Sequence, residues 1–389
     1  MKRIKSALIY GGYALGYLLA WCAGLLARRL PRYKKLWLIS ERKTDARDNG
    51  LHFFRYLTRE HPEINAAFLI DRDSPDYGRV RELGRVIQPW TAEHLLAFAC
   101  AQVHVSTHYM GCAPDMYRFR RLNELRLIRG KQAVIRHGIS AADAPELHCP
   151  PAHLDLYVCS AVPEYQDALH RYGHPEGVVR MLGLCRYDRL LQAPAPKRQI
   201  LVMPTWRMFL HKLSDEAFQA SDYYRTYTAL LNDPSLLAAL EEWDYRLVFY
   251  LHYMLQPYTR LFPSGHPRVA VRGLGDADVQ ELLMESAMLI TDYSSVFFDF
   301  AYMGKPLACL QFDEELFFRT QYRRGYFDFR RDGFGPVFRR PEEVSGYIRA
   351  CLERGMEPEA QYRARAEQFF GERGTDHCAK TFQAIEGLL

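Results

Sequence analysis

The sequence predicts an α/β protein built from two doubly wound domains. Three observations lead to this prediction: short apolar runs alternate with helical segments along most of the 389 residues, the alternation stops once at a proline-rich stretch, and it then starts again. This length allows two or three domains with full hydrophobic cores. A content of 48% hydrophobic and 25% charged residues is typical of a globular protein.

The first run of alternating elements predicts an N-terminal domain over residues 36–192. A polar stretch at 41–50 separates its first strand from its first helix. The expected strands are 36–40, 66–71, 85–88, 102–106, 133–135, 154–158 and 178–182. One helix is expected to begin near residue 51, and two others are expected to cover 92–100 and 165–172.

The second run predicts a C-terminal domain over residues 198–389. The linker before it reads QAPAPK at 192–197, where proline disfavours both a helix and a central strand. The expected strands are 199–203, 245–251, 269–271, 287–290 and 307–312, and the expected helices are 223–231 and 277–285.

The segment MLITDYSSVFFDFAYMGKPL at 288–307 predicts a strand, a tight turn and a helix. Ser294 or Ser295 is expected to cap the helix through its hydroxyl, and Gly304 to end it in a left-handed conformation. With the strand that follows, this βαβ unit implies a parallel sheet whose carboxyl edge carries the turn. Free N–H groups at the helix start favour an anion, commonly phosphate, although an ordinary capped helix without a ligand fits equally well.

The N-terminal residues 1–35 are predicted to form a hydrophobic segment that associates with a membrane. Residues 7–27 contain no charged side chain and as a helix would be about 31 Å long, close to the ~30 Å hydrocarbon thickness. The stronger basic flank, at 28–35, places the protein at the cytoplasmic face of the cell membrane. Four glycines and three tyrosines in this run are also compatible with a core helix of a soluble domain.

Residues 110–132 alternate apolar and basic side chains. This pattern fits an anionic lipid surface, or equally a solvated helix face.

Composition argues against several other partners. A net charge of +5 without a basic stripe or an aromatic ladder predicts no nucleic-acid binding. The nine cysteines contain no CxxC pair, so reduced thiols are expected instead of disulfides or a zinc site. His104 and His108 flank a predicted strand end, so no metal and no other cofactor is predicted.

Polar residues follow several predicted strands and define the candidate site. His137, beside Gly138, is a candidate general base, although a histidine in the core or on the surface is the commoner case among 14 histidines. Arg207 is expected to hold a diphosphate through paired hydrogen bonds. The remaining candidates at the carboxyl edge of the second sheet are Thr205, His252, Asp292, Ser294 and Ser295.

The ordered motifs resemble those of the CDP-glycerol glycerophosphotransferase family, whose members start or extend poly(glycerol phosphate) chains of teichoic acids and related capsules. The resemblance covers about residues 37–328. Its most specific part is LITDYSSVFFDF at 289–300, followed by KP at 305, QFD at 311 and RGYFD at 324. Supporting matches are SER at 40, DNG at 48, HG at 137, GLCRYD at 183, PTWR at 204 and LH at 251.

The resemblance implies a GT-B-like architecture, with two Rossmann-like domains facing a cleft and the nucleotide donor mainly in the second. It also implies that His137 and His252 are the histidines of the active cleft. Arg207, Ser294, Ser295 and Arg324 would bind the donor phosphates and the cytidine ribose. Three positions depart from the family pattern, which usually has Trp at Arg136 and Pro at Cys185 and Tyr253.

The expected reaction is transfer of glycerol phosphate from CDP-glycerol to a hydroxyl of a membrane-anchored acceptor, a lipid-linked glycan or glycerol phosphate. His137 would accept the proton, Asp292 would orient the turn or a ribose hydroxyl, and CMP would leave. A sugar-nucleotide glycosyltransferase of similar architecture and a non-enzymatic membrane-bound nucleotide-binding protein are the alternatives. The sequence does not decide whether the protein is a primase or a polymerase, or whether its donor carries glycerol phosphate or ribitol phosphate. It also leaves the oligomeric state open.

Overall fold

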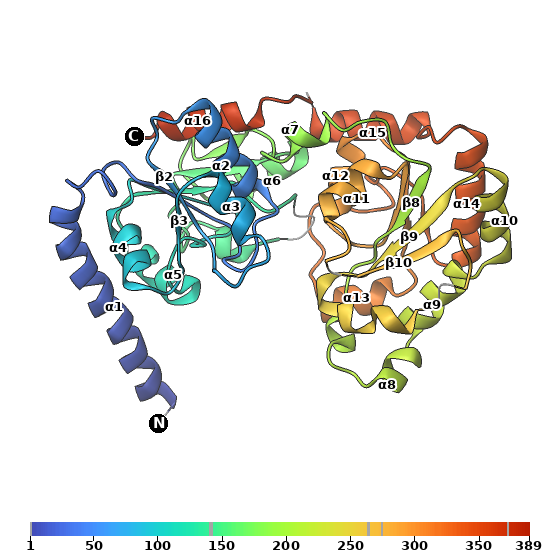
Figure 1. Ribbon diagram of the computed structural model, residues 1–389, viewed down its shortest axis with the longest axis horizontal. Coiled ribbons are helices and arrows are strands. Elements are labelled where there is room, and N and C mark those ends of the chain that lie inside the picture. The colour runs from blue at the N-terminus through green and yellow to red at the C-terminus, as the bar shows by residue number, and fades with distance from the viewer. Residues whose placement is uncertain (1, 140–142, 263–264, 274, 372) are drawn as a thin grey trace. The chain divides into compact units, whose positions relative to one another are not determined.

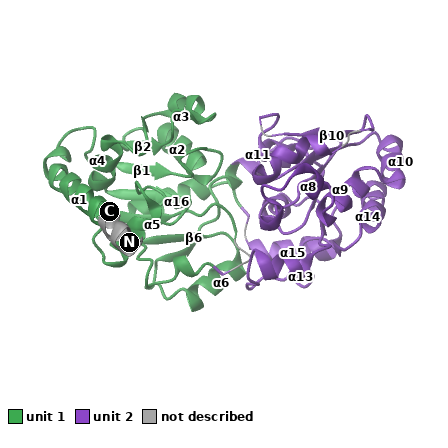
Figure 2. Cartoon of the chain, turned by 90° about the horizontal axis from the view of Figure 1, so that it is seen from below, with its two compact units in different colours: residues 1–139, 144–188, 374–389 green, residues 140–143, 189–373 purple. Residues whose placement is uncertain are grey.

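The computed structural model describes residues 2–139, 143–262, 265–273, 275–371 and 373–389, and it confirms an α/β fold (Figure 1). The chain forms two compact units, each with one parallel sheet (Figure 2). Unit 1 comprises the residues up to 139, residues 144–188 and residues 374–389, and unit 2 is formed chiefly by residues 189–373.

Unit 1 contains a seven-stranded sheet in the order β3-β2-β1-β4-β5-β6-β7. Strand order reverses between β1 and β4, whose last residues, Ser40 and Ser106, lie in register. In doubly wound sheets, ligands bind at the carboxyl ends of the strands beside such a reversal. The strands are β1 (Trp37–Ser40), β2 (Ala66–Leu69), β3 (Val86–Ile87), β4 (Val103–Ser106), β5 (Lys131–Val134), β6 (Leu156–Cys159) and β7 (Val179–Met181).

Two apolar cores, one on each face, bury this sheet. Alternate residues of β1 show the division, since Leu38 joins one core and Trp37 and Ile39 join the other. Helices α4 and α5 contribute to the first core, and helices α2 and α16 to the second. The helical segments of unit 1 and its boundary are α1 (Lys2–Ala27), α2 (Asn49–Glu60), α3 (Tyr77–Leu83), α4 (Ala92–Cys100), α5 (Met116–Glu124), η1 (Pro145–Leu147), α6 (Val162–Arg171), α7 (Tyr187–Leu190) and α16 (His377–Glu386).

Helix α1 packs against unit 1 through its small and aromatic residues. The Tyr17 ring contacts Phe98 and Phe119, with centroids 5.8 and 5.6 Å apart, and its hydroxyl accepts a hydrogen bond from the Arg129 N–H (3.0 Å). Tyr13, Gly16 and Gly24 also face the rest of unit 1, where they lie beside Phe119, Leu95 and Cys100. In the part of the chain that the structure describes, no helix has the length and apolar character needed to cross a membrane. Membrane association stays a prediction.

Unit 2 contains a six-stranded parallel sheet in the order β10-β9-β8-β11-β12-β13, so its strand order reverses between β8 and β11. The strands are β8 (Gln199–Val202), β9 (Arg246–Tyr250), β10 (Val269–Arg272), β11 (Met288–Thr291), β12 (Leu307–Leu310) and β13 (Val337–Phe338). The helical segments are η2 (Met208–Leu210), α8 (Asp215–Gln219), α9 (Asp222–Leu231), α10 (Pro234–Glu242), η3 (Tyr253–Leu261), α11 (Val279–Glu285), α12 (Val296–Tyr302), α13 (Glu314–Thr320), α14 (Pro341–Glu353) and α15 (Ala360–Phe370).

The predicted βαβ unit is present as β11, α12 and β12, and Gly304 ends the helix with φ +72° as expected. The predicted serine cap is wrong. Ser295, the N-cap residue, has helical dihedral angles (φ −65°, ψ −20°), and its side chain makes no capping hydrogen bond. A capping hydroxyl needs an extended backbone at this position. Helix α12 is also short, at seven residues.

Helix α16 lies outside the domain that was predicted to contain its residues. The predicted second domain ran to residue 389, but α16 belongs to unit 1. Its Phe382 ring stacks on His61 at a centroid distance of 3.7 Å and lies 5.8 Å from the Trp37 ring. The Asp188 carboxylate accepts hydrogen bonds from the backbone N–H groups of His377 and Cys378 at 2.8 and 2.9 Å. The chain thus returns to cover an apolar face of the first sheet.

We predict that Phe382→Ala lowers the free energy of unfolding of unit 1 by about 3 kcal/mol, because it leaves a cavity beside Trp37 and His61. Amide hydrogen exchange checks this locally: exchange should accelerate in α2 and stay unchanged in β9. Phe209→Ala, at an exposed position of unit 2, is the matched control. Unchanged protection of α2 would contradict a stabilising role for α16.

Candidate active site

The segments after β8 and β11 meet at the carboxyl edge of the unit 2 sheet. The Thr205 N–H donates to Asp292 Oδ1 at 2.8 Å, and the Tyr293 N–H donates to the same oxygen at 2.6 Å. Asp292 is fully buried and therefore ties the two turns to each other. The structure thus brings together the Thr205 and Asp292 motifs, at the reversal of strand order where a ligand is expected.

Arg207 is buried beneath this edge with all five of its N–H donors used. Its Nε and Nη2 bind Asp313 at 2.7 and 3.0 Å, and Nη2 also binds Asp292 at 2.9 Å. Nη1 donates to the carbonyl oxygens of Thr205 and Trp206 at 2.8 and 3.4 Å. The side chain has 0% exposure.

This environment corrects the prediction that Arg207 holds a diphosphate. Burial alone would lower the pKa of Arg207, but the carboxylates of Asp292 and Asp313 raise it well above its usual range. The guanidinium therefore stays charged and neutralises these two acids. With no donor left, Arg207 holds the site together instead of contacting a ligand. Four aromatic rings lie within 6 Å of its Cζ atom: those of Tyr223, Tyr293, Phe312 and Phe317.

Smaller groups at the same edge are available to a ligand. The Thr205 hydroxyl is buried without a hydrogen-bond partner among the described residues, which is a costly state for a polar group. Within the same residues, the hydroxyls and backbone N–H groups of Ser294 and Ser295 also make no hydrogen bond. Thr205, Ser294 and Ser295 therefore remain the candidates for binding CDP-glycerol or a similar anionic ligand, because these groups have unused hydrogen-bonding capacity among the described residues.

His252 and Arg324 lie on other segments of the same edge. The His252 ring, after β9, is stacked with Trp206 at a centroid distance of 6.1 Å, and its Nδ1 accepts the Met254 N–H at 3.3 Å. Arg324 is exposed after α13, where Nη1 pairs with Glu314 at 3.0 Å and the guanidinium lies 4.3 Å from the Phe318 centroid. A ligand that binds Arg324 must compete with Glu314.

His137 lies at the carboxyl edge of the unit 1 sheet, on a backbone that is firmly held. Arg136 has a left-handed conformation (φ +59°), and its carbonyl oxygen accepts a hydrogen bond from Asn49 Nδ2 at 2.9 Å. Arg186 Nη1 donates to the His137 carbonyl oxygen at 2.8 Å and pairs with Asp48 at 2.7 Å. The early DNG motif and the later GLCRYD motif therefore position the candidate base.

The pKa of His137 lies well below its usual range. Although the side chain is solvent-exposed, the protein atoms packed around it desolvate the ring, and neighbouring charges add to this effect. The imidazole is therefore neutral at physiological pH, as a general base requires. In order of effect after desolvation, the groups that disfavour its protonation are His108, Arg136, Arg186 and Arg42.

Sequence reasoning missed His108, which it considered only as a metal ligand beside His104. His104 is buried and its Nε2 lies 3.0 Å from the Arg129 carbonyl oxygen, so it has a structural role. In the described parts of the chain, no three His, Cys, Asp or Glu side chains lie close enough to hold a metal. The sequence feature that could have identified His108 is its position two residues after the end of β4.

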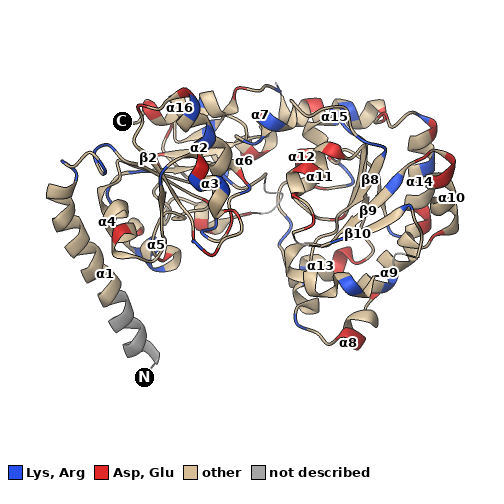
Figure 3. Ribbon diagram, in the orientation of Figure 1, with Lys and Arg blue, Asp and Glu red and all other residues tan. Residues whose placement is uncertain are grey.

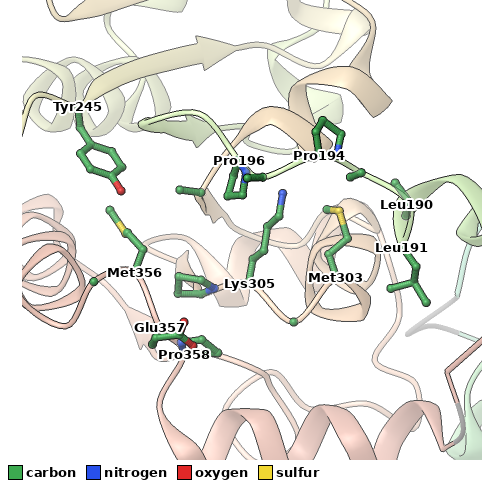
Figure 4. Close-up of a pocket in the computed structure, with 16 residues that line it drawn as sticks. Leu190, Leu191, Pro194, Pro196, Tyr245, Met303, Lys305, Met356, Glu357 and Pro358 are labelled. Atoms are coloured by element: carbon green, nitrogen blue, oxygen red, sulfur yellow. The ribbon is translucent and has the colours of Figure 1, made fainter.

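Lys and Arg side chains are interspersed with Asp and Glu over both units (Figure 3). A cavity of about 400 Å³ lies in unit 2 at the amino ends of the strands, away from the candidate site (Figure 4). Desolvation lowers the pKa of its Lys305 to about 8, and this ammonium donates to the carbonyl oxygens of Leu283, Met284 and Ser286. None of the predicted site residues lines this cavity.

Two Rossmann-like units with polar segments at their strand-order reversals define a doubly wound α/β protein, a class whose ligands bind at that edge of the sheet. The model of the family described as CDP-Glycerol:Poly(glycerophosphate) glycerophosphotransferase matches residues 23–380, and the chain belongs to this family.

Curated relatives and solved structures are consistent with this family. The "Minor teichoic acid biosynthesis protein GgaB" of Bacillus subtilis (strain 168) is 28% identical over 363 residues, 90% of this chain and 40% of that protein. A "Teichoic acid poly(glycerol phosphate) polymerase" of Bacillus spizizenii is 34% identical over 178 residues, 46% of this chain and 41% of the relative. The chain thus spans about 40% of the length of these relatives. The "Wall Teichoic Acid Polymerase TagF" (H548A) shares the fold, with a TM-score of 0.68, 16% identity and coverage of 100% of this chain and 98% of the TagF chain.

We predict that Arg207→Gln lowers the free energy of unfolding of unit 2 by about 3–5 kcal/mol, because it leaves the buried carboxylate of Asp292 and the partly buried one of Asp313 without a counter-charge. Arg324→Gln should change it by less than about 1 kcal/mol, since its ion pair is exposed. Urea denaturation of both variants checks the difference. A stable Arg207→Gln protein with weakened donor binding would restore the interpretation of Arg207 as a direct phosphate ligand.

Proposed function

We propose that this chain transfers glycerol phosphate from CDP-glycerol to a hydroxyl of an acceptor and releases CMP. The observation that carries this proposal is the family match, which includes every candidate residue in both units. The relatives named as teichoic acid polymerases, and a solved TagF structure described with CDPG, support the same donor.

In the proposed reaction, the acceptor oxygen attacks the phosphorus that carries glycerol, and the bond from this phosphorus to the CMP oxygen breaks. Neutral His137 of unit 1 accepts the proton of the attacking hydroxyl. Unit 2 binds the donor through Thr205, Ser294 and Ser295, with Arg324 neutralising phosphate charge. His252 assists departure of CMP, while Arg207 and Asp292 hold the turns in place. Phosphoryl transfer of this kind depends chiefly on alignment and charge stabilisation.

We predict CMP release from CDP-glycerol in the presence of a lipid-linked acceptor that ends in glycerol phosphate, measured by chromatography. CDP-ribitol and a panel of sugar nucleotides are the competing donors, and mass spectrometry of the product gives the number of units added. Turnover of a sugar nucleotide in place of CDP-glycerol would instead support the glycosyltransferase alternative.

Thr205→Val tests the site in this assay. Loss of one hydrogen bond of about 1.4 kcal/mol corresponds to a roughly tenfold higher KM for CDP-glycerol, with stability preserved because the hydroxyl has no partner. Thr228→Val, which removes another unpartnered hydroxyl in unit 2, is the matched control and should leave KM unchanged. Equal effects of both variants would contradict a ligand at Thr205.

We further propose that α1 lies along the cytoplasmic face of the cell membrane, where a lipid-linked acceptor is found. Its leucines after residue 10 are exposed, and basic residues at 28–35 follow the helix, as in interfacial helices that bind anionic lipid. The exposed leucines, at 49–70%, are Leu15, Leu18, Leu19, Leu25 and Leu26 in α1 and Leu30 just after it.

We predict that the protein sediments with phosphatidylglycerol vesicles and that Leu19→Asp combined with Leu26→Asp lowers this binding at least tenfold. Each substitution replaces an apolar group that the headgroup region buries with a charge that anionic lipid repels. Leu169→Asp, an exposed leucine of α6, should bind as the wild type does. Undiminished sedimentation of the double variant would exclude α1 as the membrane contact.

A further inference from the structure

The loop after β4 places a second imidazole against the candidate base. The rings of His108 and His137 lie parallel, with centroids 4.7 Å apart and planes inclined by 1°. Their residues follow neighbouring strands, since β4 and β5 pair in register from Val103 with Lys131 to Ser106 with Val134. The parallel sheet therefore delivers both rings to one edge.

The backbone that carries His108 is held on both sides of the ring. The His108 carbonyl oxygen accepts hydrogen bonds from Ser106 Oγ (2.6 Å) and from the Gly111 N–H (2.9 Å). Lys43 Nζ, from the segment after β1, donates to the Gly111 carbonyl oxygen at 2.8 Å. The ring itself is fixed through its Nδ1, which lies 2.9 Å from the Thr107 hydroxyl. The ring of His108 is thus held in place by its backbone and by Thr107.

The ring of His137 is held differently. Hydrogen bonds from Asn49 and Arg186 fix the backbone around it, but neither of its ring nitrogens has a hydrogen-bond partner among the described residues. In many active sites a carboxylate or carbonyl group orients the histidine base. Here, the stack on His108 is the contact that sets the plane of the ring, and both nitrogens remain available to a substrate.

We propose that His108 is a positioning residue that orients the His137 ring and shields one of its faces from water. This inference rests on the proposed role of His137 as the base. Stacking fixes the plane in which the lone pair points, and the neighbouring ring excludes water from one face of the imidazole.

The positive charges at this edge of the sheet also favour the neutral form of both rings. Desolvation, followed by Arg42, Arg136, Lys43 and Arg120, lowers the pKa of His108 to about 4, so both rings are neutral at physiological pH. Protonation of one ring would place a cation against the other, among several cations already present. The charged and titratable groups that act on the pair from the surrounding elements are Arg42, Lys43, Arg120, Arg136 and Arg186.

The decisive experiment is an NMR titration of the full-length protein labelled in histidine, with the His137 signal assigned from a His137→Gln variant. In His108→Ala, the pKa of His137 should rise toward about 6.5, the ordinary value, because water reaches the exposed face. CMP release should then fall at every pH because the ring loses its orientation, and it should fall about a further tenfold between pH 8 and pH 5.5, where His137 becomes protonated, relative to the wild type.

His108→Phe retains a flat ring without a titratable group. It should keep most of the lowered pKa and most of the turnover, whereas His170→Ala, an exposed histidine of α6, should change neither. An unchanged His137 titration in folded His108→Ala would overturn the proposal. If that variant does not fold, a folded but inactive His108→Phe overturns it, and a wild-type pH profile in His108→Phe supports it. Absence of CMP release from any donor by the wild type would refute the proposed function alone, since the titration still decides the role of His108.

Discussion

The buried cation of Arg207 is the interaction on which the candidate donor site depends. Its guanidinium is fully buried between two carboxylates, Asp292 at 2.9 Å and Asp313 at 2.7 Å. Removing such charges from water is costly, and the pairing recovers this cost only because all five donors of the guanidinium are satisfied. As a result, the turns after β8, β11 and β12 are held in fixed positions relative to one another. The ligand then meets small groups whose positions are already set.

Unit 1 uses the same principle with different residues. Asn49 and Arg186 bind the carbonyl oxygens of Arg136 and His137, and Asp48 pairs with Arg186. These residues come from the start of α2 and from the loop after β7, on either side of the turn that they fix. Arg207 of unit 2 was predicted to bind a ligand, and Arg186 of unit 1 belongs to one of the family motifs. In the structure, both arginines hold neighbouring backbone segments in place. Buried ion pairs hold backbone segments firmly, because breaking one contact leaves a buried charge or polar group without a partner.

Much of this arrangement follows from local sequence, and the remainder depends on tertiary packing. Buried parallel strands are short apolar runs, so β1, β2, β4, β8 and β11 were located to within one or two residues. Periodicity also identified α4, but it could not show which sheet α16 covers, because an amphipathic helix does not specify its partner. Arg207 could not be recognised as buried from its motif, since Asp313 lies 106 residues away. His108 was separated from His137 by a helix and a strand, so only the sheet register brings their rings together.

The cationic surroundings of His137 also bear on the kind of acceptor that fits. Four positive or titratable neighbours lower the basicity of its imidazole, which by itself makes proton abstraction less favourable. The same charges stabilise an anion beside the ring, and an acceptor hydroxyl that loses a proton gains negative charge in the transition state. A substrate that brings its own phosphate would further compensate the arginines and raise the pKa of His137 only once it is bound. Under the proposed function, an anion bound beside His137 would therefore raise the basicity of the imidazole at the moment when it acts as the base.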